Sequence, residues 1–327
     1  MDIIKAIASE LNVRNNQVEA AVKLIDEGCT IPFISRYRKE ATGALNDEQL
    51  RNLDERLKYL RNLEDKKTQV IASIAEQGLL TDELKNQIEK ADTMVAVEDL
   101  YRPYRPKRRT RATIAKEKGL EPLANIIMLQ MTGEPVVKTA EEYVSEEKDV
   151  KTPEDAVAGA KDIIAESISD NADYRTRIRE LTFKEGVLTS AAKDAEAKTV
   201  YEMYYNFSEP AAKMAGHRIL AVNRGENEKI LTVKIEAPVD KILEYLEKQI
   251  IVRDNRYTTG IIKEAIEDSY ERLIAPSIER EIRNQLTETA EAGAIKVFGR
   301  NLEQLLLQPP ITGHVVPVSY THLTLPT

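Results

Sequence analysis

Residues 97–124 read VEDLYRPYRPKRRTRATIAKEKGLEPLA, and this stretch lies between two segments with helical periodicity. Pro103 and Pro106 exclude a regular helix in its middle, because proline lacks an amide hydrogen and restricts the residue before it. Six residues in this part are basic: Arg102, Arg105, Lys107, Arg108, Arg109 and Arg111. The stretch therefore predicts a stiff, basic connection between two helices.

This basic connection belongs to an acidic chain. The chain has 47 Lys and Arg against 55 Asp and Glu, a formal net charge of −8, whereas residues 98–118 contain eight basic residues and three acidic ones. Tyr101 and Tyr104 alternate with the cations. A local basic patch with interleaved aromatic residues is typical of contacts to the nucleic-acid backbone. The alternative is a solvated turn whose arginines pair with the acidic helices around it.

The composition predicts a mainly α-helical protein. The 327 residues include only 13 Gly and 13 Pro, too few for an all-β chain with many tight turns. The single cysteine, Cys29, excludes an internal disulfide. Charges interrupt the first residues, MDIIKAIASELN, unlike a signal peptide, and no apolar run approaches the roughly 18–20 residues of a membrane span. We expect a cytoplasmic monomer without a membrane partner.

Helical spacing dominates the chain before the basic connection. Two short helices, 2–11 and about 17–27, with a polar break at 12–16, resemble half of a helix-turn-helix. A long helix follows: Asn46 or Asp47 caps its start, leucines keep the helical period to about Gln77, and Gly78 ends it. At 1.5 Å per residue this helix would span about 45 Å. We interpret it as a spine for smaller helices.

The pattern after residue 150 predicts further helices and one β-hairpin. Thr152-Pro153-Glu154-Asp155 is a typical helix start, with a capping hydroxyl followed by proline and two acids. Residues 218–223 and 230–236 are expected to pair as a hairpin around Gly225. A helical period continues from Gly260 to Gly293, kinked or split at Pro276. Residues 294–308 are expected to be helical with these side chains inward: Val297, Phe298, Leu302, Leu305 and Leu306.

These patterns divide the chain into five segments. They are an N-terminal helical region with the long spine (1–78), a helical region with the basic junction (79–207), a β-hairpin segment (208–240), long C-terminal helices (241–316) and a tail (318–327). The tail, VSYTHLTLPT, resembles the in-frame translation of a transposon-end sequencing adapter. We therefore expect the tail to be non-native, and an ordinary disordered C-terminus is the alternative.

No recognisable catalytic, metal or cofactor motif is present in the sequence. The three histidines, His217, His314 and His322, are scattered, and HExxH, CxxC, GxGxxG and P-loop patterns are absent. Cys29 lies beside an apolar run, where a buried filler is expected instead of a nucleophile. We expect no catalytic residues, no bound metal and no cofactor.

Four stretches of the chain together resemble the signature blocks of the bacterial Tex family of RNA-binding transcriptional accessory proteins. They are residues 31–50, 97–124, 208–231 and 297–310, and they occur in the family's order. The resemblance implies a helical N-terminal half with helix-turn-helix-like elements and a long central helix. In the family a resolvase-like domain, helix-hairpin-helix domains and an OB-fold RNA-binding domain follow. The block that begins the resolvase-like domain would start near Val315-Val316, where the tail replaces it, so the chain resembles the N-terminal module alone.

The sequence thus favours a non-enzymatic, nucleic-acid-associated transcription accessory module that acts as a scaffold. Its expected partners are the RNA or DNA backbone, bound weakly, and the transcription or translation machinery. The first candidate contacts are the six cations of residues 102–111, and the second are Arg36, Arg38 and Lys39. Salt bridges to Glu40 and Asp47 are an equal alternative for Arg36 and Arg38. Two other readings stay open: a protein-interaction scaffold without nucleic-acid binding, and part of a nuclease whose catalytic domain is absent here.

Overall fold

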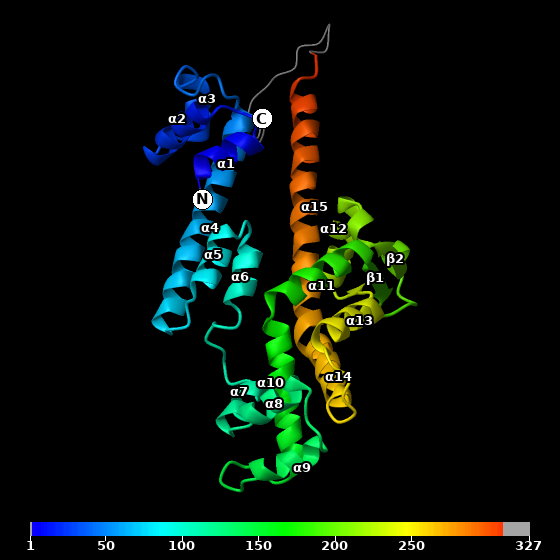
Figure 1. The fold of residues 1–327 in the computed structure, drawn as a ribbon. Coiled ribbons are helices and arrows are strands. Elements are labelled where there is room, and N and C mark those ends of the chain that lie inside the picture. The colour runs from blue at the N-terminus through cyan, green and yellow to red at the C-terminus, as the bar shows by residue number, and fades with distance from the viewer. Residues whose placement is uncertain (1, 310–327) are drawn as a thin grey trace. The chain divides into compact units, whose positions relative to one another are not determined.

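The computed structural model describes residues 2–309 and is mainly helical, with one small antiparallel sheet (Figure 1). The expected fold class is confirmed. The chain separates into two compact units. The first comprises Met1–Glu180 and Val239–Ile278, and the second comprises Leu181–Pro238 and Glu279–Thr327. None of the described helices combines the length and the apolar character that a membrane span requires.

The long helix organises the N-terminal part of the first unit. Asn46 caps this helix by accepting a hydrogen bond from the Gln49 amide, and five leucines along one face are buried: Leu50, Leu53, Leu57, Leu60 and Leu63. The expected spine is therefore confirmed. The helices of this part are α1 (Ile3–Glu10), α2 (Asn15–Asp26), α3 (Ile31–Tyr37), α4 (Asp47–Glu76), α5 (Asp82–Lys90) and α6 (Met94–Tyr101).

The helix α10 (Pro153–Asp170) is central to the remainder of the first unit. Thr152 caps it as expected, by accepting a hydrogen bond from the Asp155 amide at 3.1 Å. Four helices contact α10: α7 (Arg111–Glu117), α8 (Glu121–Leu129), α9 (Val136–Ala140) and α14 (Thr259–Asp268). A 3₁₀ turn (Glu141–Tyr143) follows α9, and α13 (Val239–Ile250) precedes α14. The helix α11 (Ala172–Glu185) leads from the first unit into the second.

The second unit contains a three-stranded antiparallel sheet with the order β2-β1-β3. Ser190 of the central strand lies opposite Phe207 on one side and Val233 on the other. The strands are β1 (Val187–Ala192), β2 (Asn206–Pro210) and β3 (Leu231–Glu236), and β3 buries alternate residues as a one-sided strand does. Two 3₁₀ turns, Glu202–Tyr204 and Ala211–Lys213, flank β2.

The predicted hairpin is wrong in its first strand. Residues 218–223 lie in the helix α12 (Gly216–Asn227), whereas the second expected strand is confirmed as β3. Gly225 is a helical residue that allows α12 to pack closely on β3, because an added Cβ would lie 2.6 Å from Leu231 Cδ1. The strand β1, which the sequence analysis left unassigned, pairs with β3 in place of residues 218–223.

The helical period after Gly260 forms a continuous helix of 48 residues. It consists of α14, a π-helical segment (Ser269–Ile274) and α15 (Ala275–Leu306). The π segment ends at Ile274, two residues before Pro276, which lacks the amide hydrogen that a regular helix would use at this point. The expected disruption at Pro276 therefore takes the form of a wider turn within an unbroken helix.

The expected burial of the last turns of α15 is wrong. Val297, Phe298, Leu302, Leu305 and Leu306 are all exposed, and Phe298 is 68 % exposed. The apolar spacing correctly indicates a helix face, but no described residue covers that face. The family block expected near Val315-Val316 and the tail at 318–327 lie outside the described residues. The remaining segment boundaries stay predictions.

Candidate nucleic-acid interface

The junction, defined here as residues 102–111, is fixed at its start by contacts with α4. The Tyr101 hydroxyl lies 3.0 Å from Ser73 Oγ, and Gln77 Nε2 donates a hydrogen bond of 3.0 Å to the Tyr104 carbonyl. Both tyrosines pack partly buried against the core of α1–α6. The aromatic rings that alternate with the cations in sequence therefore support the fold, and they do not form an exposed stacking surface.

A buried ion-pair network holds the helix that leads into the junction. Asp99 of α6 is 2 % exposed, and its two carboxylate oxygens accept hydrogen bonds from Arg175 Nε at 2.8 Å and Arg179 at 2.7 Å. Arg175 is fully buried and also donates to Ser277 Oγ at 2.9 Å. Such charges are stable in the interior only while they remain paired. The network therefore fixes α6 to α11 and to the first turn of α15.

Two junction cations are neutralised by carboxylates. Lys107 Nζ bonds Glu166 at 3.1 Å and also bonds Asp170 of α10. Burial raises the pKa of the Asp170 carboxyl, and the Lys107 ammonium opposes this rise. Arg109 bonds the exposed Glu117 at 3.2 Å. For these two residues the structure therefore shows the pairing with neighbouring acids that the solvated-turn alternative describes.

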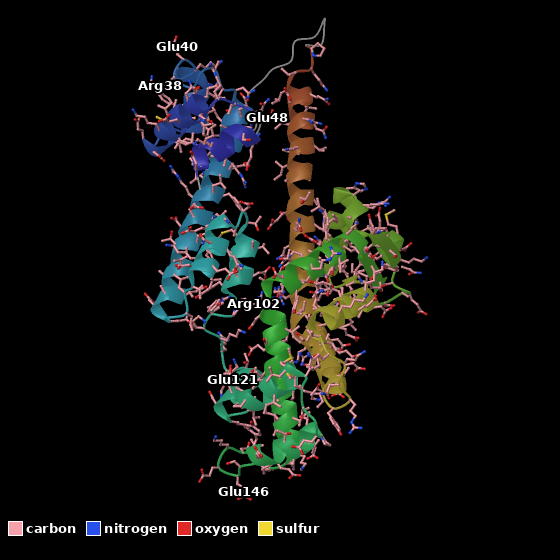
Figure 2. All side chains as sticks on the ribbon, viewed as in Figure 1. Arg38, Glu40, Glu48, Arg102, Glu121 and Glu146 are labelled. Atoms are coloured by element: carbon pink, nitrogen blue, oxygen red, sulfur yellow. The ribbon has the colours of Figure 1, made fainter. Side chains whose placement is uncertain are left out.

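The other four junction arginines differ in their surroundings. Arg102 is half-buried where α6 ends (Figure 2), and its charge, like that of Lys107, opposes the rise that burial causes in the pKa of Asp170. Arg111 is exposed; burial raises the pKa of Asp162 and the Arg111 charge opposes that rise, while the pKa of Asp268 is lowered mainly by its hydrogen bond from Arg272, with a smaller contribution from Arg111. Arg105 and Arg108 are exposed, and neither has a carboxylate within 4.0 Å among residues 2–309. Of the six expected contact residues, Arg105 and Arg108 are thus exposed and have no neighbouring carboxylate among residues 2–309.

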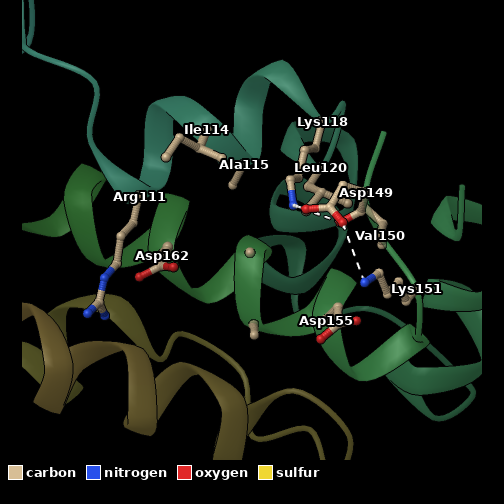
Figure 3. A pocket seen from close by; sticks show the side chains of 12 residues that line it. Arg111, Ile114, Ala115, Lys118, Leu120, Asp149, Val150, Lys151, Asp155 and Asp162 are labelled. Atoms are coloured by element: carbon tan, nitrogen blue, oxygen red, sulfur yellow. Dashed lines mark hydrogen bonds and ion pairs between the residues drawn. The ribbon is translucent and has the colours of Figure 1, made fainter. Parts of the chain in front are cut away.

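A polar pocket between α7 and α10 contains Arg111 at its edge (Figure 3). Its volume is about 450 Å³. Lys118 and Lys151 both reach Asp149 there, at 3.2 and 4.0 Å from its carboxylate oxygens. Because its cations are matched by carboxylates, including Asp155 and Asp162, this pocket adds no clear site for a phosphate.

The second candidate cluster lies at the C-terminal end of α3 and in the following turn. Arg36, Arg38 and Lys39 are all exposed, and none has a carboxylate within 4.0 Å in the described part of the chain. Asp47, a proposed partner, instead bonds Arg51 at 2.7 Å. The salt bridges considered for Arg36 and Arg38 are therefore absent from residues 2–309. Figure 2 labels Arg38 and Glu40, which lie in the turn that follows α3.

The carboxylates and arginines that fix the junction were not predicted from the sequence. Asp99 lies inside the quoted stretch 97–124, but Arg175 and Arg179 are more than seventy residues away. Glu166 and Asp170 follow the apolar face of α10 at the spacing of one helical turn, which was the available signal.

Within residues 2–309, no group of three or more His, Cys, Asp and Glu side chains is placed to hold a metal ion.

Family models match most of the chain in two parts. Residues 1–75 match the Tex-like protein N-terminal domain, and residues 132–298 match the Tex central region. The chain belongs to the Tex family. The family resemblance noted from the four sequence blocks is thereby confirmed.

Several Tex-family relatives align along nearly the whole chain. The uncharacterized protein YdcI of Bacillus subtilis is 51 % identical over 313 residues, which are 95 % of this chain and 44 % of YdcI. The transcriptional accessory protein Tex of Neisseria gonorrhoeae is 40 % identical over 320 residues, covering 95 % of this chain and 42 % of the relative. The human S1 RNA-binding domain-containing protein 1 is 30 % identical over 334 residues, covering 96 % of this chain and 33 % of the human protein. The chain spans less than half the length of these relatives.

Proposed function

We propose that this Tex-family region is a non-enzymatic helical scaffold that contacts the phosphate backbone of nucleic acid within a transcription-associated protein. Its contacts are the exposed cations of the junction and of the α3 turn. The expected partners are RNA or DNA and the transcription or translation machinery. Two relatives support this direction by their names, one as a transcriptional accessory protein and the other as an S1 RNA-binding domain-containing protein.

One observation carries the proposal. Five exposed cations have no carboxylate within 4.0 Å among residues 2–309, although the chain as a whole has a net charge of −8: Arg36, Arg38, Lys39, Arg105 and Arg108. Unpaired guanidinium and ammonium groups can replace the counterions of a phosphate backbone without first losing a protein partner.

The salt dependence of binding tests the proposal. A fluorescein-labelled 20-nucleotide RNA is titrated with the full 327-residue chain, and fluorescence anisotropy is followed between 50 and 200 mM salt. Five phosphate contacts to a single strand predict a slope of about −3.5 in log affinity against log salt. A slope near zero contradicts the proposal.

Charge-removal variants locate the contacts. Changing Arg36, Arg38 and Lys39 together to Gln should reduce the slope by about 2, and changing Arg105 and Arg108 should reduce it by about 1.4. A matched control changes three exposed lysines of the second unit, Lys193, Lys198 and Lys234, to Gln. An equal loss in the control would show nonspecific electrostatics and would contradict the assigned sites.

The second candidate is a protein-interaction scaffold without direct nucleic-acid contact. The exposed apolar side chains of α15, including Phe298 and Leu305, favour it, since a contiguous exposed apolar surface commonly marks an interaction site. This candidate predicts no RNA binding at 50 mM salt. It also predicts that substitution of Phe298 and Leu305 by Ser, but not removal of the five cations, abolishes co-purification with a transcription-complex subunit.

A further inference from the structure

The helix α3 exposes two aromatic rings that the core does not use. Ile34 is fully buried and attaches the helix to the core, while Phe33 and Tyr37 are 38 % and 67 % exposed. These two residues are four apart and therefore share one helix face. Their ring centroids are 5.3 Å apart, with an angle of 42° between the ring planes. The tilt leaves ring surface of Tyr37 open to solvent.

One cation contacts these rings, and two others are its neighbours in sequence. The guanidinium carbon of Arg38 lies 5.5 Å from the centre of the Phe33 ring, a cation–π geometry. Arg36 lies between the two aromatic residues in sequence, and Lys39 follows Arg38. The acidic neighbour Glu40 has no hydrogen bond or ion pair with these cations in the described structure. Together, Phe33, Arg36, Tyr37, Arg38 and Lys39 form what we call the α3 platform.

The backbone of the platform is fixed from inside the protein. Thr42 is fully buried, and its hydroxyl donates a hydrogen bond of 3.2 Å to the Arg38 carbonyl. Gln17 Nε2 of α2 donates a 2.8 Å hydrogen bond to the Gly43 carbonyl. Gly43 and Ala44 both have positive φ, 59° and 64°, which turns the chain sharply back toward α4. The backbone that carries Arg38 and Lys39 is thus held in an ordered turn directly after the two rings.

We propose that the α3 platform binds unpaired bases of single-stranded nucleic acid, with Tyr37 stacking on a base and Arg36, Arg38 and Lys39 contacting the flanking phosphates. Exposed aromatic rings next to cations are the combination that single-strand binding requires. Bases within a duplex are already stacked and cannot reach a ring on a helix surface. An acidic peptide would satisfy the cations but would leave the ring faces unused. This inference rests on the proposed function and narrows it to single strands at this site.

A tryptophan reporter tests the stacking directly. The chain contains no tryptophan, so Tyr37→Trp introduces a single indole at the platform. Titration of the full chain with a 12-nucleotide oligouridine should quench its fluorescence, whereas a 12-base-pair duplex should not. The control is Phe298→Trp, which places an indole at a comparably exposed position on α15, 68 % exposed in the parent. The control should show no quenching with either ligand.

Affinity measurements distinguish the contribution of the Tyr37 ring to binding from any effect of the substitution on folding. Tyr37→Ala and Tyr37→Leu should weaken oligouridine binding at least about fivefold, because base–aromatic stacking is lost. Tyr37→Phe should retain the parent affinity within about twofold, since the ring remains. Duplex binding should be the same in all three variants. Because Tyr37 is highly exposed, these substitutions should leave the fold intact, and an unchanged thermal unfolding midpoint would verify this for each variant.

The outcomes distinguish this inference from the proposed function. If the parent binds both ligands and all Tyr37 variants bind oligouridine equally well, the stacking inference is wrong while the backbone contacts stand. If the parent binds neither ligand at 50 mM salt, both are wrong. Equal quenching of Tyr37→Trp by duplex and single strand also overturns the inference, because it shows contact without base selection.

Discussion

The junction and the α3 platform are both short basic stretches with interleaved aromatic residues, and the structure treats them in opposite ways. In the junction, Tyr101 and Tyr104 pack against α4, and Lys107 is held between two carboxylates of α10. In the platform, Tyr37 faces solvent and the cations have no carboxylate nearby within residues 2–309. Similar composition therefore gives a structural connection in one place and an available surface in the other. What decides between them is the presence of acidic side chains on a neighbouring helix.

The largest expected effect comes from the buried charges behind the junction. Asp99→Ala removes the buried carboxylate that accepts hydrogen bonds from both Arg175 and Arg179, which should lower the free energy of unfolding by about 3–5 kcal/mol. Urea unfolding followed by circular dichroism measures this loss. The control is the neighbouring Glu98→Gln, whose side chain is 60 % exposed and only 3.8 Å from Lys66, and it should change stability by less than about 0.5 kcal/mol. Equal effects of the two changes would show that the network does not support the junction.

A smaller effect is expected from Lys107→Met, which removes the cation between Glu166 and Asp170. Charge-assisted hydrogen bonds of partly buried groups predict a loss of about 1.5–3 kcal/mol at pH 7. Because burial already raises the pKa of Asp170 in the folded state, its ionised form is costly there and its protonated form is not. The cost of the substitution should therefore decrease as the pH falls and Asp170 becomes protonated. Urea midpoints at pH 7 and pH 4.5 measure this, and a cost that grows at low pH contradicts it.

Loss of the neutral hydrogen bond between Thr42 and the Arg38 carbonyl should reduce the stability of the protein at the α3 platform. Thr42→Val removes the buried hydroxyl that bonds the Arg38 carbonyl and should cost about 1 kcal/mol of stability. Its matched control is Thr68→Val on α4, where the hydroxyl bonds the Glu64 carbonyl at an exposed position, and we expect almost no change. Thermal unfolding compares the two. An unperturbed Thr42→Val protein would show that the turn does not depend on this contact.

The smallest effect concerns the exposed pair of Arg109 and Glu117. Arg109→Gln should alter stability by less than about 0.5 kcal/mol, because an exposed ion pair contributes little. It should also weaken RNA binding less than Arg108→Gln, since Arg109 already has an acidic partner and Arg108 has none in the described structure. Anisotropy titrations of the two variants at 50 mM salt provide the comparison. A greater loss with Arg109→Gln would mean that pairing does not determine which junction cations are available.

Local signals in the sequence were sufficient for most helices. The caps at Asn46 and Thr152 and the leucine spacing after Leu50 predict α4 and α10 correctly, because these features act within one or two helical turns. The first strand of the expected hairpin was wrong because residues 218–223 are apolar enough for either structure. The true partner of β3 is β1, more than forty residues earlier in the chain, and no local pattern indicates such a pairing.

The candidate site was predictable in its residue types but not in its pairing. Clusters of Arg and Lys are visible in any sequence, whereas the positions of Glu166, Asp170 and Asp99 relative to them depend on how α6, α10 and α11 pack. The same limit explains the exposed end of α15. Its apolar period correctly predicts a helix, but periodicity gives only the direction of a face and not whether another segment covers it.

The ion pair between Asp99 and Arg175 joins positions 76 residues apart and so closes a ring of chain without a covalent bond. The junction, α7, α8, α9 and α10 all lie within this ring. Its most exposed arc, from Arg105 to Arg109, offers several peptide bonds that trypsin could cut. Because α6 and α11 are joined at the closure, one cut in that arc should leave both fragments associated as a nicked but folded protein. Asp99→Ala removes the ion pair that closes the ring. In this variant the same cut should let the two fragments separate.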